Sequence, residues 1–350
     1  MTLLRVLTKK QIVLITLIFS MLLVFMILTI TAGNMKKAMI DQRAAQRWSN
    51  GGEDFSQVSC FFADGEAITF NEIMGFRGYI ESSIKEASLT APSNNARAYI
   101  DAYSSIGTVN IRSERSALET AAIGIGGDFF LFHPLELVNG AYFSGHDLMQ
   151  DAVILDEEAA WHLFGSSDII GMPVSIGGVN HYVRGVIKRE TGRMWEGAGL
   201  SGGVAYISND SLSLYGQTMG IRSYEVVMPN PVSGFAYRVV TEKFGFSEER
   251  MKVVDNTARF NLQPLALVIL DVGLRSMQSY AIRFPYWENY ARGYEDILAF
   301  LLVFQVLFLV TPVTMMLVIV FVVSKREIRK WVALRRKRKH DYKYEGYEKF

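Results

Sequence analysis

Five histidines are the side chains in this sequence best suited to bind a metal or to transfer a proton near neutral pH. They are His133, His146, His162, His181 and His340. Their spacing matches no metal-ligand motif, and the zinc-protease pattern His-Glu-x-x-His is absent. His162 falls on a short predicted helix, where we expect a half-buried structural residue. The sequence therefore predicts no metal site.

Glycine and carboxylate patterns give no better support for catalysis. Gly124-x-Gly126-Gly127 has the composition of a phosphate-binding loop, but it lies inside a strand-like run. The ATP-binding pattern Gly-x-x-x-x-Gly-Lys-Ser/Thr is absent, and the carboxylates form no recognisable catalytic pair. We therefore predict no catalytic residue and no cofactor, and we disfavour an extracellular enzyme.

Two long apolar runs are more informative than any polar motif. Residues 11–33 and 297–323 carry no charge, and each exceeds the ~20 residues that a helix needs to cross a bilayer core of about 30 Å. The first run is longer than the apolar part of a secretory signal peptide, which has about 7–15 residues; a signal peptide is the alternative. We predict two transmembrane helices with residues 34–296 looped out between them.

The distribution of charge predicts the orientation. Residues 1–33 carry a net charge of +3 and residues 297–350 carry +7, while the whole chain carries +1, so residues 34–296 carry −9. Basic segments beside a span stay on the cytoplasmic side of the membrane. We therefore expect a cytoplasmic segment 1–10, a basic cytoplasmic tail 324–350, and an extracellular or periplasmic loop, in a plasma or inner membrane.

The loop between the spans predicts an α+β domain. Stalks are expected over 34–52 and, with an interfacial segment, over 263–296. Residues 53–112 and 213–262 each show a strand, a helix and a strand by periodicity, so two βαβ units would form one small sheet with both helices on one face. The single cysteine, Cys60, allows no disulfide within the chain and is expected to be a buried small side chain.

Between these halves, residues 113–212 are rich in glycine and β-formers and predict an inserted β-rich subdomain. A short helix over 157–164 should end at Gly165. The strand-like segments on either side of Gly177-Gly178 should pair as a hairpin, because two glycines suit the tight turn between antiparallel strands.

An ordered series of short motifs in this insertion resembles the periplasmic core domain of MacB-type ABC transporter permeases. The match covers roughly residues 120–212, and each piece alone is weak. The motifs are Ile125-Gly126-Gly127-Asp128-Phe129-Phe130, Leu137-Val138-Asn139-Gly140-Ala141-Tyr142-Phe143 with Asp147, Ala152-Val153-Ile154-Leu155, Ala159-Ala160-Trp161-His162-Leu163-Phe164-Gly165, Ile170-Gly171-Met172-Pro173-Val174, Ile176-Gly177-Gly178-Val179-Asn180-His181-Tyr182-Val183-Arg184-Gly185-Val186-Ile187 and Val204-Ala205-Tyr206-Ile207.

The resemblance implies a non-catalytic permease-like subunit served by a cytoplasmic ABC ATPase on a separate chain. Family members usually have four spans, so further permease subunits, or a homo-oligomer, would supply the spans that this sequence lacks. Ala141 stands where arginine is common in the family, and Met172-Pro173 replaces a Lys-Thr-like pair. The resemblance does not identify the extracellular substrate or partner.

The basic tail carries an apolar anchor. Trp331 and Val332 interrupt the charges of a predicted helix, and tryptophan is a frequent anchor at protein interfaces. We expect these two side chains to insert into the ATPase, with residues 1–10 as a second cytoplasmic coupling element. The alternatives are attraction of the charges to anionic lipid and a headgroup position for Trp331, whereas nucleic acid is not an expected partner. The residues expected to flank the contact are Arg329, Lys330, Arg335 and Arg336.

Polar and aromatic residues near the second span suggest two further contacts. Pro312 should kink the helix, and Gln305 lies seven residues earlier on nearly the same face. Because a lone amide is costly in lipid, we expect this face to meet another helix. Tyr286, Trp287 and Tyr290 should form an aromatic belt at the membrane interface, with a ligand-binding aromatic patch as the alternative.

Together these observations predict a membrane subunit that couples a separate ATPase mechanically to an outer domain. One alternative is a two-span receptor or scaffold whose outer domain binds a ligand or a hydrolase without transport. Another is a plain assembly subunit that completes a heteromeric transporter.

Overall fold

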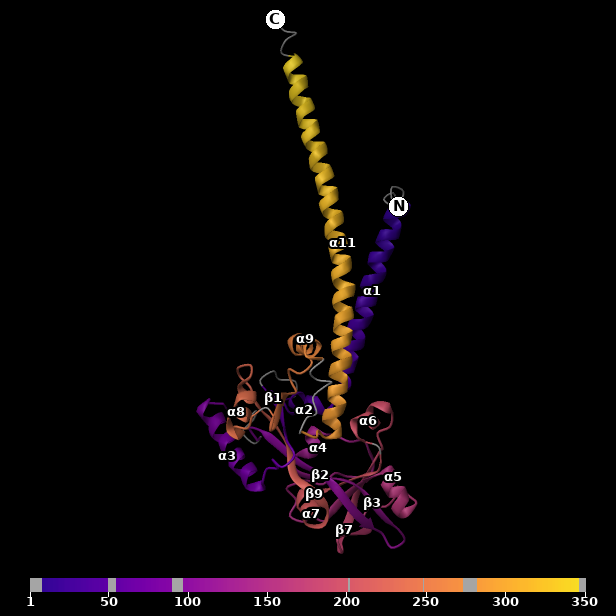
Figure 1. Ribbon diagram of the computed structural model, residues 1–350, viewed down its shortest axis with the longest axis vertical. Helices are drawn as coiled ribbons and strands as arrows, with labels where there is room; N and C mark the ends of the chain where they lie inside the picture. Colours follow the sequence, from indigo (N-terminus) through magenta and orange to yellow (C-terminus); the bar gives the residue numbers. More distant parts are fainter. Residues whose placement is uncertain are drawn as a thin grey trace. The chain divides into compact units, whose positions relative to one another are not determined.

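Figure 1 shows the computed structural model of the chain. The chain divides into two compact units, one formed by Met1–Met35 with Ala299–Phe350 and the other by Lys36–Leu298. The structure describes residues 8–49, 55–89, 97–200, 202–247, 249–272 and 282–345, with side chains up to residue 336.

Two long helices carry the apolar runs. They are α1 (Lys9–Ala38) and α11 (Tyr286–Glu345), and within the described residues they are the two helices long and apolar enough to cross a membrane. Pro312 lies inside α11 without ending it. Part of the stalk expected over 263–296, the second run and most of the tail therefore belong to one helix.

A mixed ten-stranded sheet forms the centre of the other unit. Its strands are β1 (Phe55–Phe62), β2 (Ile100–Arg112), β3 (Ala117–Gly127), β4 (Leu137–Gly140), β5 (Ala152–Asp156), β6 (Pro173–Ile176), β7 (Val179–Ile187), β8 (Val204–Ser208), β9 (Gln217–Pro229) and β10 (Met251–Asp255). Nine strands follow one another in the order β10-β1-β9-β2-β3-β8-β5-β7-β4, and β6 pairs with β2 and β7. The short helices of this unit are η1 (Asp41–Arg43), α2 (Ala44–Trp48), α4 (Phe129–Phe132), α5 (Glu157–Phe164), α6 (Arg193–Ala198), α7 (Asn209–Tyr215) and α9 (Leu262–Leu270).

Helices α3 (Phe70–Glu86) and α8 (Phe235–Phe244) cover one face of the sheet at the β10–β2 end, where Figure 1 shows them together. Ile73 and Phe76 of α3 and Val240 of α8 share one buried cluster with Val58 of β1 and Tyr224 of β9. The helices predicted within 53–112 and 213–262 are thus present and pack on the same face. β1 pairs antiparallel with both β10 and β9, and β2 pairs antiparallel with β9.

The strands of residues 113–212 continue this sheet and do not form a separate one. β2 and β3 have 13 and 11 residues, long enough for their hairpin to join the β9 side to β8. Gly126 lies on β3, and a Cβ built on it would stand 2.0 Å from the Tyr103 ring. Close packing therefore explains the glycines that have the composition of a phosphate loop.

Local signals in the insertion are confirmed. Asp156 caps α5 through the backbone N–H of Ala159, and Gly165 ends the helix with a φ of 72°. β6 and β7 pair antiparallel around Gly177-Gly178. Cys60 is buried, as predicted.

The prediction for His162 is wrong. Its side chain is exposed, because α5 turns Ala159, Ala160 and Leu163 toward the sheet instead.

Candidate functional site

A chain of charged and polar side chains runs through the core of the Lys36–Leu298 unit. It joins η1, the ends of β1 and α4, strand β9, the loop after β10, and the first turns of α11. We call it the buried charge network. Its members are Asp41, Ser59, His133, Glu225, Asn256, Arg259, Glu288, Arg292 and Glu295.

Arg259 is the centre of one end of the network. Its guanidinium donates to both carboxylate oxygens of Glu288, at 2.6 and 2.8 Å, and to Oε1 of Glu295 at 2.5 Å. The side chains of Arg259 and Glu288 are both 2% exposed. Burial alone would lower the pKa of Arg259, but the two carboxylates outweigh it and raise the pKa. The guanidinium therefore stays charged and holds one face of α11 to the loop after β10.

A relay of hydrogen bonds continues from this end into the sheet. Arg259 also donates to Oδ1 of Asn256, and Nδ2 of Asn256 donates to Oγ of Ser59 at 2.7 Å. Ser59 in turn donates to Oε1 of Glu225 at 2.6 Å. Since nearly all these groups are buried, each contact replaces water that the folded chain has removed.

His133 forms the other end of the network. Its Nε2 contacts Oε2 of Glu225, and its Nδ1 lies 3.5 Å from Oδ1 of Asp41. Burial alone would lower the pKa of His133, but the two carboxylates outweigh it and raise the pKa to about 9. The imidazole is therefore a buried cation at neutral pH.

Trp287, the second residue of α11, packs directly on this cation. Its ring centroid lies 4.5 Å from that of His133 and 5.5 Å from that of Phe129. The side chain is 2% exposed, so the prediction that Trp287 lies in an aromatic belt at the membrane interface is wrong.

The neighbouring tyrosines of the expected belt also pack on the domain. The hydroxyl of Tyr286 lies 2.7 Å from that of Tyr206. The ring of Tyr290 stacks on that of Trp195 at 3.7 Å with an interplanar angle of 8°. The first two turns of α11 are therefore fixed by aromatic packing as well as by charge.

The segment after α1 is tied to the same place. Oε1 of Gln57, on β1, accepts from the backbone N–H of Ala44 at 2.8 Å, and Nε2 of Gln57 donates to the carbonyl of Asp41 at 2.7 Å. Nζ of Lys36 donates to the carbonyl of Phe260 at 2.6 Å. The chain leaving α1 and the chain entering α11 thus contact one small region around β1 and the loop after β10.

The comparisons with known proteins agree with this architecture. The sequence matches the family model described as the MacB-like periplasmic core domain over residues 12–234, more than half of the chain. The chain belongs to this family. Comparison with curated protein sequences finds no match.

Three solved structures are similar to parts of this chain. The extracellular domain of the noncanonic ABC-type transporter YknZ from Gram-positive bacteria is 16% identical, with 57% of this chain and 100% of that chain covered and a TM-score of 0.38. The periplasmic region of MacB from Actinobacillus actinomycetemcomitans is 13% identical, with 64% and 94% covered and a TM-score of 0.39. A domain of a putative permease protein from Porphyromonas gingivalis is 13% identical, with 58% and 90% covered and a TM-score of 0.34.

Family membership and the two long apolar helices identify a membrane protein of the ABC transporter permease kind. The buried charge network and the contacts of Lys36 and Gln57 hold the start of α11 and the chain after α1 to the region around β1 and the loop after β10.

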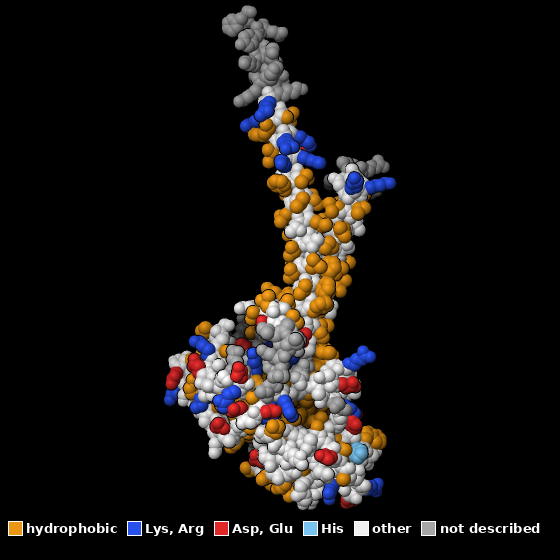
Figure 2. Space-filling view, viewed as in Figure 1, with side chains coloured by type: hydrophobic (Ala, Val, Ile, Leu, Met, Phe, Trp, Pro, Cys, Tyr) orange, Lys and Arg blue, Asp and Glu red, His pale blue; other side chains and the backbone are white. Residues whose placement is uncertain are grey.

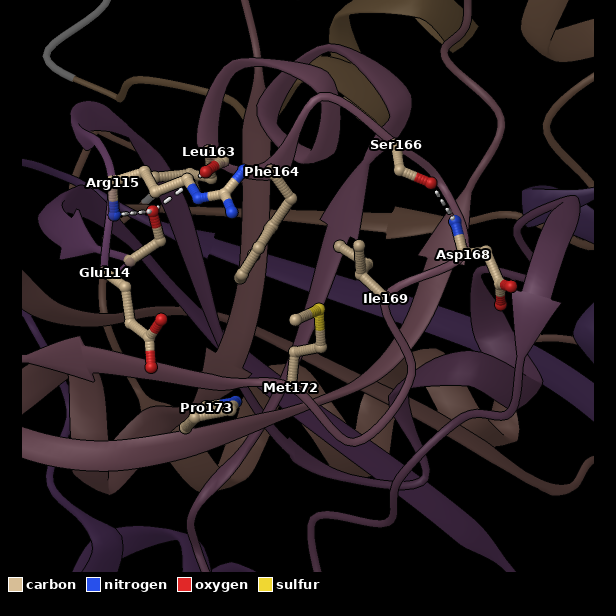
Figure 3. Close-up of a pocket in the computed structure, with 10 residues that line it drawn as sticks. Glu114, Arg115, Leu163, Phe164, Ser166, Asp168, Ile169, Met172 and Pro173 are labelled. Carbon is tan, nitrogen blue, oxygen red and sulfur yellow. Dashed lines mark hydrogen bonds between the residues drawn. The ribbon is translucent and has the colours of Figure 1, made fainter.

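Figure 3 shows a pocket of about 330 Å³ between the β2–β3 turn and the loop after α5. Its polar groups bond to one another: Oγ of Ser113 donates to the carbonyl of Leu163, and Oγ of Ser166 accepts from the N–H of Asp168. The ten lining residues include no histidine, cysteine or lysine. In the described part of the chain, no cluster of His, Cys, Asp or Glu has the arrangement of a metal site.

One sequence pattern needs comment because it resembles a hydrolase motif. Residues 199–203 read Gly-Leu-Ser-Gly-Gly, which fits Gly-x-Ser-x-Gly. In hydrolases that serine stands between a strand and a following helix, whereas here α6 precedes the segment and β8 follows it. Ser201 itself lies outside the described residues. The fold therefore gives this pattern no catalytic context.

The predicted coupling residues lie together on α11, in the other unit. Trp331 is 54% exposed and Val332 is 38% exposed. The guanidinium of Arg335 lies over the Trp331 ring at 4.1 Å, and Nζ of Lys330 bonds to Glu327 at 2.7 Å. Arg329 and Arg336 are exposed as well.

Gln305 and Pro312 also lie on α11, on its less exposed stripe. Gln305 is half-buried and Pro312 is buried. Phe308 and Met315 are half-buried too, so this stripe repeats every three to four residues, as expected where a helix has a neighbour.

Sequence reasoning missed the buried charge network because its members are far apart in the chain. Ser59 and Glu225 are 166 residues apart, and Ser59 and Asn256 are 197 apart. One signal was present: Glu288 and Glu295 are seven residues apart on nearly the same face of a helix that leads into an apolar run. Two acids on one face of such a helix indicate a buried basic partner.

Proposed function

We propose that this chain is a membrane subunit that couples a cytoplasmic ABC ATPase, carried by a separate chain, to a MacB-like domain outside the membrane. Membership of the permease family supports the ATPase as a partner. The printed sequence contains no ATP-binding Gly-x-x-x-x-Gly-Lys-Ser/Thr pattern, which supports its being a separate chain. Further permease subunits, or a second copy, would complete the membrane part.

The observation that carries this proposal is the attachment of α11 at its first turns. Arg259 holds Glu288 and Glu295, which are two helical turns apart on one face. α11 then continues as a single helix to Glu345 and includes the basic segment. A displacement of that segment would pass along a continuous helix to a buried, charge-fixed end, and from there to the sheet.

The fold of the outer domain suits this role. We interpret β1–α3–β2 and β9–α8–β10 as two interleaved βαβ units. Strand β9 lies between β1 and β2, and strand β1 lies between β9 and β10. A force applied to β1 through Gln57 would therefore act on both βαβ units. Both termini would be cytoplasmic, with residues 34–296 outside, as the charge distribution indicates.

A conservative substitution tests the attachment. Arg259→Lys keeps the charge, but one ammonium cannot reproduce the guanidinium fork that binds Glu288 and Glu295 together. We expect the variant to assemble with the ATPase and to lose most of the ATP-driven change in spin-label distances across the outer domain. Arg250→Lys is the matched control, because Arg250 pairs with Glu66 on the surface. An unchanged response in Arg259→Lys would refute mechanical coupling through this network.

The cytoplasmic contact needs its own test. We infer that Trp331 and Val332 anchor the ATPase, with Arg329, Lys330, Arg335 and Arg336 around them. Trp331→Ala, with all basic residues kept, should lower co-purification of the ATPase. Neutralising the basic residues while keeping Trp331 is the control for lipid attraction. If only that control weakens the complex, the tail anchors lipid, and if no ATPase co-purifies with the wild type, the receptor or scaffold alternative is favoured.

We propose that Gln305, on nearly the same face as Pro312, also contacts another membrane subunit. An amide within a lipid-facing run is favoured only where it finds a partner, and Gln305 is only half-buried within this chain, so part of its surface is open to one. Gln305→Leu should weaken assembly in detergent, measured by the mass of the purified complex. Val306→Leu, at a 51% exposed position next to it, is the control.

A further inference from the structure

Helix α9 is an apolar short helix of the Lys36–Leu298 unit. Its sequence LQPLALVIL contains no charged residue. Leu265 and Val268 are buried, and the opposite side is exposed, with Leu267 at 51% and Leu270 at 77%. The atoms around α9 are mostly hydrophobic in Figure 2. Exposed leucines on one face of a helix are costly in water, so a covering partner is expected.

The residues just before α9 contact residues that lie close to the two apolar runs in the sequence. Phe260, two residues before the helix, bonds to Lys36, in the last turn of α1. Arg259 bonds to Glu295, which stands two residues before the apolar run 297–323. The root of α9 is therefore bonded to residues at the outer end of both apolar runs.

The residues around Lys36 are of the types that suit the headgroup layer of a membrane. Lys36 and Lys37 end α1, and Ile40, three residues on, is 51% exposed. Basic side chains beside exposed aliphatic ones suit phosphate headgroups above acyl chains. With nine residues α9 is about 14 Å long, too short to cross a core of about 30 Å.

We propose that α9 lies in the outer leaflet, parallel to the membrane surface, with Leu267 and Leu270 among the acyl chains. We assign lipid as the occupant of the exposed face, because Phe260 and Arg259, just before α9, bond to Lys36 and Glu295, which stand next to the two apolar runs in the sequence. In this position α9 would hold the loop after β10, and with it Arg259, at a fixed depth. The proposal rests on the two membrane helices and not on the ATPase, so it can fail independently of the proposed function.

Site-directed spin labelling of the full chain tests this placement. The protein, with Cys60→Ala, is placed in vesicles of phosphatidylcholine and phosphatidylglycerol. A nitroxide is attached to Gln263→Cys, Leu267→Cys or Leu270→Cys, one at a time. Gln263 is exposed, so its substitution disturbs no core and keeps the test valid if a leucine variant folds poorly.

Collision with oxygen, which concentrates in lipid, is compared with collision with a water-soluble nickel chelate. Phe300→Cys, 64% exposed within the apolar run, is the lipid reference, and Met149→Cys, 71% exposed between β4 and β5, is the water reference. We expect an excess of oxygen over nickel collisions on α9, as at Phe300. Nickel-dominated collisions like those at Met149, or protection from both reagents by a covering protein, would overturn the proposal.

Discussion

Replacing His133 by glutamine should change how the stability of the outer domain depends on pH. His133 is buried between Glu225 and Asp41, and the ring of Trp287 packs beside it at a tilt of 42°. Glutamine has a similar length and can still donate to Glu225, but it cannot carry the proton. The substitution therefore removes a titratable cation and leaves two carboxylates facing each other across the same space.

The magnitude follows from the pKa of His133. Its pKa rises from 6.5 to about 9 on folding, and each unit corresponds to about 1.4 kcal/mol, so protonation contributes about 3 kcal/mol to folding. Because the folded pKa is the higher one, the folded state binds the proton more tightly. The contribution is fully present below pH 6.5, decreases as the pH rises, and is lost above about pH 9.

The assay compares resistance to unfolding in the intact protein in detergent between pH 6 and pH 9.5, by pulse proteolysis. Wild type should lose stability across this range by about 3 kcal/mol more than His133→Gln does. His181→Gln is the matched control, because the His181 ring faces neutral atoms, the carbonyl of Val179 and Oγ of Ser211. Parallel profiles for wild type and His133→Gln, or an NMR titration of His133 near pH 6.5, would refute the reasoning.

Three further outcomes are expected. Gly145→Ala places a Cβ 2.4 Å from the backbone nitrogen of Gly127 and should cost about 1–3 kcal/mol of stability in thermal unfolding. Gly75→Ala, inside α3 with open space around the new Cβ, should stabilise by about 0.5–1 kcal/mol in the same assay. In a Cys60→Ala background, Leu148→Cys, at a fully exposed position, should react with an impermeant maleimide added outside intact cells, whereas Ser324→Cys should not; the reverse labelling would contradict the proposed orientation.

Short-range features of this fold are predictable from the sequence because neighbouring residues determine them. The end of α5 at Gly165 and the hairpin at Gly177-Gly178 follow from glycines that adopt positive φ. The two apolar runs follow from length and composition. The parallel pairing of β3 with β8, which carries the main sheet into the rest of the insertion, does not, because it joins residues far apart in the chain, such as Ile123 and Tyr206.

The buried charge network illustrates the limit for a candidate site. Trp287 was expected at the interface because it lies near an apolar run, and tryptophan is frequent in that layer. Only the fold shows that His133 and Phe129 meet it in the core. A tryptophan beside an apolar run looks the same in the sequence whether it lies at the membrane interface or in the protein core. Which of the two it occupies depends on the residues that the fold places next to it.

The two ends of the network together restrict how α11 can move. Trp287, Glu288 and Glu295 all face inward, as do Ala291 and Leu298, which are 0% and 1% exposed. A buried ion cluster adds little net stability compared with apolar packing, but its geometry is specific. Rotation of α11 about its own axis would leave Arg259 buried without Glu288 and Glu295 and would move Trp287 away from His133, whereas a tilt that carries the β1 region with it would keep these contacts. Under the proposed coupling, the motion passed through α11 would therefore be a tilt shared with the sheet.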